Sequence, residues 1–148
     1  MSIYKAVGSA AVAARTMLTL ISTATIRPRL IAAIYSQVGA VVLDSNWQIT
    51  GRRFTAAGTT TAITPAGSDS SDPASTFTAG SNATVEPTYT ANSTFQDLGI
   101  NPRSTFRWVA YDPRDEIIMP ASAANGLGFV LTTLGGAITA QVEASVLQ

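Results

Sequence analysis

The stretch ITAQVEASV at residues 138–146 alternates strictly between apolar and polar side chains. Its apolar members are Ile138, Ala140, Val142, Ala144 and Val146. Successive side chains of a β-strand point to opposite faces of a sheet, so a period of two indicates an extended strand. The pattern predicts a C-terminal strand with one face on a hydrophobic core and the other toward solvent or a partner.

Outward from this strand, the chain contains further short segments rich in threonine, valine, isoleucine and aromatic residues. The predicted strands are residues 3–7, 16–22, 29–37, 47–54, 60–64, 94–98, 104–111, 116–119 and 127–133. Alanines give residues 10–20 some helix propensity, but Thr16, Thr19 and the β-branched run that follows favour extended structure. We predict an all-β fold: an antiparallel jelly-roll or Greek-key β-sandwich, formed as a single domain by residues 1–148.

Residues 55–93 differ from the rest, because nearly all of them are alanine, threonine, serine, glycine or proline. Proline cannot donate a hydrogen bond to a neighbouring strand, so Pro65, Pro73 and Pro87 should lie outside central strands. A structureless loop of this length is uncommon in a compact domain. We therefore expect long connections with short strands embedded in them.

The composition removes most enzymatic chemistry. The 148 residues include no histidine, no cysteine and a single lysine. Histidine is the side chain that titrates near neutral pH, and thiolates are the usual soft metal ligands and strong nucleophiles. Without these residues, a serine–histidine–acid triad and a cysteine–histidine dyad are both impossible. We expect a non-enzymatic structural or binding protein with no cofactor, no bound metal and no small-molecule substrate.

The charge balance argues against two classes of partner. Nine basic residues offset nine acidic ones, whereas nucleic acids and anionic membranes both reward a basic surface. The longest apolar stretch, residues 30–43, is interrupted by polar residues and is shorter than the roughly 20 residues that span a bilayer. We expect neither nucleic acid nor membrane as the main partner.

Two groups of acidic residues could carry chemistry. Asp112, Asp115 and Glu116 could supply the paired carboxylates of a glycosidase, and Asp69 and Asp72 could offer oxygens to calcium. In both places proline and serine neighbours favour a turn with local pairing. We interpret both groups as turns.

Arginine supplies eight of the nine basic residues. Its planar guanidinium binds carboxylates through two donors and is enriched at protein interfaces, as are large aromatic side chains. A G+C-rich genome, or arginines that are solvated or locally paired, would also explain the bias. Alternation along a strand should send Arg52 and Arg53 to opposite faces. The candidate interface residues are Arg27, Arg29, Trp47, Arg52, Arg53, Arg103 and Arg107.

Several phrases occur together in the chain: TIRPR at residues 25–29, RFTAAGT at 53–59, TVEPTYT at 84–90, RSTFRWVA at 103–110 and PASAANGLG at 120–128. With the alternating final strand, they resemble a family of small jelly-roll capsid decoration, or cement, proteins encoded among the head genes of tailed bacteriophages. The resemblance runs from about residue 16 to the C-terminus.

This resemblance implies a homotrimer on the outer surface of the virion capsid, where it bridges subunits of the major capsid protein. It also implies that residues 1–15 could form an N-terminal arm or an exchanged strand. Two alternatives stay open. One is a carbohydrate- or receptor-binding jelly-roll module, for which Trp47 or Trp108 would provide the aromatic platform, although Trp108 is expected in the core. The other is a tail or spike component of the virion.

Overall fold

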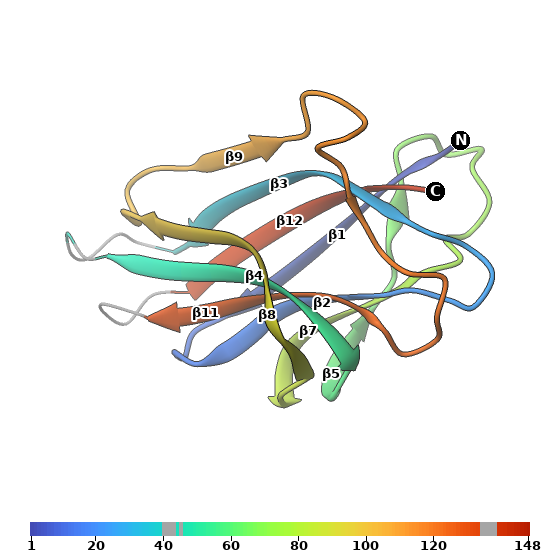
Figure 1. The fold of residues 1–148 in the computed structure, drawn as a ribbon. Coiled ribbons are helices and arrows are strands. Elements are labelled where there is room, and N and C mark those ends of the chain that lie inside the picture. The colour runs from blue at the N-terminus through green and yellow to red at the C-terminus, as the bar shows by residue number, and fades with distance from the viewer. Residues whose placement is uncertain (40–43, 45, 134–138) are drawn as a thin grey trace.

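The structure is a computed structural model that describes residues 1–39, 44, 46–133 and 139–148. It contains two six-stranded sheets packed face to face (Figure 1). The strands are β1 (Ile3–Ala10), β2 (Arg15–Ile21), β3 (Arg29–Val38), β4 (Trp47–Ala56), β5 (Thr59–Ile63), β6 (Ala66–Gly67), β7 (Thr78–Val85), β8 (Thr88–Ile100), β9 (Phe106–Val109), β10 (Ile117–Ile118), β11 (Gly126–Thr133) and β12 (Thr139–Leu147). No helix among the described residues is long and apolar enough to cross a membrane.

The strand order in both sheets is that of a jelly roll. In sheet A, the upper layer of Figure 1, β12 lies between β1 and β3, and β9 pairs with the other edge of β3. In sheet B, the lower layer, β11 lies between β2 and β4, and β8 follows β4. Each sheet thus inserts a C-terminal strand between two N-terminal ones, as the double Greek key requires. The predicted antiparallel jelly-roll β-sandwich is confirmed.

The final strand shows the predicted alternation. Ala140, Val142, Ala144 and Val146 are fully buried, whereas the residues between them are partly exposed. Ile138, the first residue of the predicted stretch, lies outside the described residues. The pairing of β12 with β1 runs from Ile3 opposite Leu147 to Ala10 opposite Ala140. Beyond it, the backbones of Ser2 and Gln148 exchange two hydrogen bonds of 2.9 and 3.0 Å.

Residues 1–15, considered above as an arm or an exchanged strand, contribute β1 to the sheet of their own chain. β1 lies between β12 and the short β6, and its inward side chains Tyr4, Ala6 and Ala10 are buried. Exchange of this strand between chains stays a prediction.

The core between the sheets is built from leucine, alanine, valine and aromatic side chains of both layers. Burying each large apolar side chain contributes about 1.5–3 kcal/mol. Its largest fully buried members are Trp47, Tyr4, Tyr35, Phe77, Phe129, Met17, Leu18, Leu20, Leu30, Ile49 and Met119. The Tyr35 hydroxyl donates a hydrogen bond to Gln96 Oε1 inside this core, and burial raises the Tyr35 pKa.

The expectation of long connections with short embedded strands within residues 55–93 holds for β5 and β6, but β7 is a longer strand that the sequence did not predict. β7 spans eight residues between β5 and β2, and β8 begins at Thr88. The many small residues lower the β-propensity of this segment, but the packing of its strands requires them. A side chain on Gly80 would collide with Thr60 of β5. Pro65, Pro73 and Pro87 all lie outside the strands, as predicted.

Side chains from the β7–β8 turn and the start of β8 cover part of the outer face of sheet B. Glu86 accepts hydrogen bonds from the Thr16 backbone N–H (3.1 Å) and hydroxyl, and the Tyr89 hydroxyl bonds the Thr16 oxygen at 2.6 Å. The Tyr89 ring packs edge-on against Phe54, and the Arg52 guanidinium lies 4.7 Å from its centre. We call Thr16, Arg52, Phe54, Glu86 and Tyr89 the Tyr89 cluster.

Gly128 makes room for this cluster. A Cβ at this position of β11 would collide with the Tyr89 side chain. Burial raises the Tyr89 pKa, and the nearby Glu86 carboxylate adds to this, while the Thr16 hydrogen bond and the Arg52 charge oppose it. Sheet B therefore buries Phe54, which is 2% exposed, on a face that points away from the main core.

Candidate functional site: an arginine hollow and a bare sheet face

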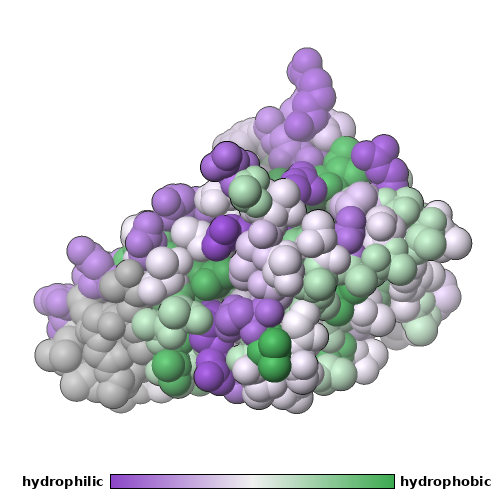
Figure 2. Space-filling model, turned by 60° about the horizontal axis from the view of Figure 1, so that its bottom comes forward, coloured by the Kyte–Doolittle hydropathy of each residue, from purple (hydrophilic) through white to green (hydrophobic). Residues whose placement is uncertain are grey.

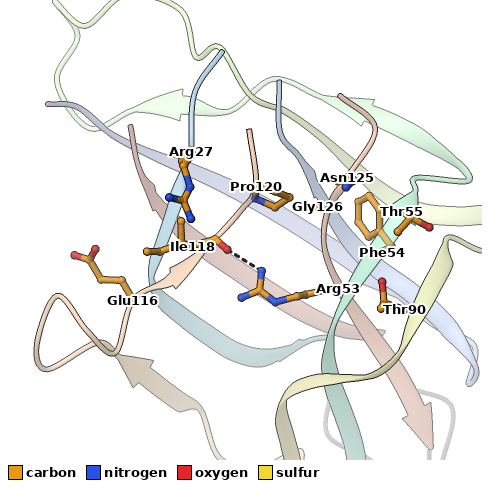
Figure 3. Close-up of a pocket in the computed structure, with 10 residues that line it drawn as sticks. All are labelled: Arg27, Arg53, Phe54, Thr55, Thr90, Glu116, Ile118, Pro120, Asn125 and Gly126. Carbon is orange, nitrogen blue, oxygen red and sulfur yellow. Dashed lines mark hydrogen bonds between the residues drawn. The ribbon is translucent and has the colours of Figure 1, made fainter. Parts of the chain in front are cut away.

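Two of the predicted interface arginines, Arg27 and Arg53, line one hollow at an end of the sandwich (Figure 3). Its volume is about 520 Å³. We call it the arginine hollow. The residues that line it are Arg27, Arg53, Phe54, Thr55, Thr90, Glu116, Ile118, Pro120, Asn125 and Gly126.

Arg53 is held in place by an irregularity in β4. The pairing of β4 with β8 shifts register on both sides of Arg52, and Ser93 accepts a hydrogen bond from the Arg53 backbone N–H (3.2 Å). Arg52 then packs on Tyr89 outside sheet B, while Arg53 Nη1 donates to the carbonyl oxygen of Ile118 in sheet A at 2.7 Å (Figure 3). The two arginines take different sides of the sheet, as predicted.

Arg27 precedes β3 and is exposed, and it forms no ion pair within the part of the chain that the structure describes. Its guanidinium points toward the region of Ile118, as Figure 3 shows. The hollow thus receives one solvent-exposed guanidinium and one that is anchored and partly buried.

Arg29, unlike Arg27, forms an ion pair with Glu116. Their atoms Nη1 and Oε2 are 2.8 Å apart, and the side chains are only 28% and 11% exposed. Glu116 also lines a second hollow, which lies over the outer face of sheet A. The Arg29–Glu116 pair therefore stands at the boundary between the two hollows.

The second hollow, about 510 Å³ in volume, belongs to a sheet face that carries several partly exposed apolar side chains. Val109 is 43% exposed, Val7 42% and Tyr111 100%. The charged residues that line the second hollow are Lys5 and Glu143, which form a salt bridge of 2.9 Å, together with Arg107, Asp112 and Glu116. We call this surface the bare face; its apolar residues are Ile3, Val7, Ile31, Ile34, Val109, Tyr111 and Leu147.

The remaining predicted residues are dispersed. Arg107, on β9, lies on the bare face and forms no ion pair with any described residue. Arg103 pairs with Asp44 at 3.1 Å in exposed loops. Trp47 is fully buried, so it belongs to the core and its side chain offers no surface to a partner in the folded chain. Trp108 is partly buried against the core.

Residues 112–115 and 69–72 form turns, as interpreted from the sequence, but the pairing is not all local, because Glu116 pairs with Arg29. Asp112 pairs with Arg114 at 2.8 Å, and hydrogen bonds from the Arg114 side chain and backbone lower the Asp112 pKa. Asp69 accepts a hydrogen bond from the Ser71 N–H, and Asp72 accepts one from the Ser2 hydroxyl. No group of three or more potential metal ligands occurs within the described residues.

Sequence reasoning missed the groups that complete both hollows. The Ile118 carbonyl anchors Arg53, and a backbone oxygen carries no sequence signal. The sequence predicts Tyr111 as the last residue of a strand over residues 104–111, yet the Asp-Pro that follows it marks a turn and could have placed it beyond the end of β9. No family model, curated protein or solved structure matches this chain.

Proposed function

We propose that this chain is a non-enzymatic structural protein that decorates the outer surface of a tailed-phage capsid. In this proposal it acts as a homotrimer and bridges subunits of the major capsid protein. The capsid setting rests on the sequence resemblance described above. The observation that carries a binding role is the bare face, because a small protein rarely leaves so many apolar side chains of one sheet in contact with water.

The make-up of the bare face fits a protein partner. Tyrosine and arginine are enriched where binding energy concentrates, and Tyr111 and Arg107 both lie here beside Val109. The charges of this face are of both signs: Lys5 pairs with Glu143, and Arg107, Asp112 and Glu116 also line the second hollow. Such a surface favours apolar contact with another protein over attraction to a polyanion.

Bridging stabilises a shell by mass action, because a ligand that binds only the assembled form shifts the equilibrium toward it. A trimer strengthens this effect, since its second and third attachments are effectively intramolecular. Neither step requires catalytic residues. A chain without histidine and cysteine is compatible with this role.

The test compares phage heads that carry this protein with heads from which its gene is deleted. Decorated heads should release their genomes at a higher temperature, and particle imaging should show threefold density on the outer surface. Adding back Val109→Asp protein should restore less stability than the matched variant Thr61→Asp, whose exposed position lies on β5, away from the bare face. Equal release temperatures with and without the protein would rule out cementing.

Carbohydrate binding is the second candidate, and only one observation favours it. Trp47 is buried and Trp108 is partly so, which removes the expected platforms, but the Tyr111 ring is fully exposed beside Arg107. A glycan array with wild-type and Tyr111→Ala protein decides this candidate. A tail or spike location would appear in the same particle images.

A further inference from the structure

The arginine hollow carries a local excess of positive charge in a chain that is neutral as a whole. Arg27, Arg29 and Arg53 bring three positive charges to it or to its border, and Glu116 brings one negative charge, which leaves two. Glu116 is already bonded to Arg29, and Figure 3 shows its carboxylate directed away from Arg53. The hollow is therefore electropositive, and no described acidic residue pairs with Arg27 or Arg53.

The donors of the hollow are partly organised in advance. Arg53 uses Nη1 for the Ile118 carbonyl, which fixes the plane of its guanidinium while other N–H groups stay free of described partners. Arg27 enters from the segment that precedes β3, and Asn125 and Thr90 also line the space. A guanidinium that is held before binding loses less side-chain entropy when it binds a carboxylate.

Apart from the Thr55 hydroxyl, the rest of the lining is apolar. Ile118 and Pro120 contribute hydrocarbon surface, Phe54 is only 2% exposed, and Gly126 has no side chain. A bare inorganic anion would leave this surface unused. A ligand that combines a carboxylate with a neighbouring apolar group would use both the guanidinium groups and the hydrocarbon surface.

We propose that the arginine hollow is a socket for a glutamate or aspartate side chain of a partner protein, presented on an extended segment next to an apolar residue. Glu116 lines both this hollow and the bare face, so a segment leaving the socket would continue onto the apolar side chains of sheet A. The inference rests on the proposed function only in taking a protein as the source of the carboxylate.

The socket is tested with the full chain labelled with ¹⁵N, by following the arginine Nε–Hε signals in NMR titrations. The probes are the peptides acetyl-Leu-Glu-Leu-amide and acetyl-Leu-Gln-Leu-amide, and inorganic phosphate at matched ionic strength. The glutamate peptide should shift the Arg27 and Arg53 signals and bind about tenfold more tightly than the glutamine peptide, because charge-assisted hydrogen bonds are the stronger ones.

Variants separate the socket from a general charge effect. Arg27→Gln should weaken binding of the glutamate peptide about tenfold without unfolding the chain, since Arg27 is exposed and unpaired among the described residues. Arg53→Gln should do the same, and circular dichroism checks that it folds. The control Arg114→Gln removes an arginine that is 90% exposed and outside the hollow, and it should leave binding unchanged.

Three results would overturn the proposal: equal binding of the two peptides, an equal loss in Arg114→Gln, or tighter binding of phosphate to the same two arginines. Particle experiments keep this outcome apart from the proposed function. If wild-type and Arg27→Gln proteins stabilise heads equally, the socket fails and cementing stands. If heads gain nothing from the wild-type protein while the peptide results hold, cementing fails and the socket stands.

Discussion

The two sheets of this protein treat their outer faces in opposite ways. Sheet B covers part of its outer face with its own chain, through the Tyr89 cluster, and buries Phe54 there. Figure 2, which brings the bottom of the molecule forward, shows a surface of mostly intermediate hydropathy with scattered hydrophilic and hydrophobic residues. No described residue covers sheet A in this way, and Val7, Val109 and Tyr111 stay in contact with water.

The difference comes from the segments that connect the strands. Between β4 and β8 the chain inserts β5, β6 and β7, and the turn after β7 brings Glu86 and Tyr89 onto sheet B. The segment that follows β9 passes beside sheet A and leaves Tyr111 fully exposed. A covered face contributes to folding stability, whereas an apolar face left open is available for contact with another molecule.

Removing a large ring from each outer face should give the largest contrast. Phe54→Ala should lower the free energy of unfolding by about 3–5 kcal/mol, because Phe54 is 2% exposed and its loss leaves a cavity beneath Tyr89. Tyr111→Ala should change it by less than about 0.5 kcal/mol, since the ring is fully exposed. Urea unfolding followed by tryptophan fluorescence measures both.

A similar small loss in both variants would mean that the Tyr89 cluster does not cover sheet B in solution. A large loss of unfolding free energy in Tyr111→Ala would instead contradict the exposure of Tyr111 on the bare face, because it would require Tyr111 to pack against its own chain.

High pH should destabilise the fold through its buried tyrosines. Burial raises the pKa of Tyr35 between the sheets and of Tyr89 outside sheet B. Below about pH 10 both are protonated whether the chain is folded or not. Above it, unfolded tyrosines ionise while the folded ones resist, so the free energy of unfolding falls as pH rises toward the folded pKa. The slope for Tyr35 approaches about 1.4 kcal/mol per pH unit.

Tyr89 is more exposed than Tyr35 and should contribute a shallower slope. Urea unfolding between pH 8 and pH 11 tests this with Tyr35→Phe and Tyr89→Phe. Both variants should flatten the pH dependence, Tyr35→Phe more strongly. With a single lysine in the chain, few other groups titrate in this range. An unchanged slope in Tyr35→Phe would show that this ring is not the group responsible.

A smaller contrast compares one glutamate from each outer face. Glu86→Gln should lower the free energy of unfolding by about 1 kcal/mol, because it weakens charge-assisted hydrogen bonds to the fully buried Thr16. Glu143→Gln removes only the Lys5 ion pair of sheet A, whose lysine is 52% exposed, and should cost less than about 0.5 kcal/mol. Thermal unfolding of the two variants at low and high salt measures both losses. A larger loss in Glu143→Gln than in Glu86→Gln would contradict this comparison of the two faces.

Where one face of a strand is buried, the sequence predicted the fold well. The alternation in β12 and at the start of β4, and the apolar run of β3, come from side chains that meet the core directly. β7 escaped prediction because its neighbours, rather than its own residues, decide its structure. Gly80 is required by Thr60 of β5, twenty residues earlier in the chain. Such a constraint becomes visible only when the two strands are adjacent.

The candidate site was predicted only in part. Arg27 and Arg53 do meet at one hollow, but composition singled them out no more than Arg103, which pairs with Asp44 in exposed loops. What distinguishes Arg53 is the register shift in β4 and the Ile118 carbonyl across the sandwich. Both are consequences of tertiary structure. Trp47 illustrates the reverse case, because an aromatic residue at the start of a strand suits a core as well as an interface.

The hydrogen-bonded ends of the chain have a practical consequence. Ser2 and Gln148 lie next to each other, and Figure 1 places the N- and C-terminal ends at one corner of the sandwich. A peptide or fluorescent domain fused to either end would leave the protein from the same point. A short glycine-rich linker could join the ends, and new ones could be opened at the β4–β5 turn, where Gly58 adopts a positive φ of 68°. The fold is therefore suited to circular permutation and to the display of cargo from a single corner.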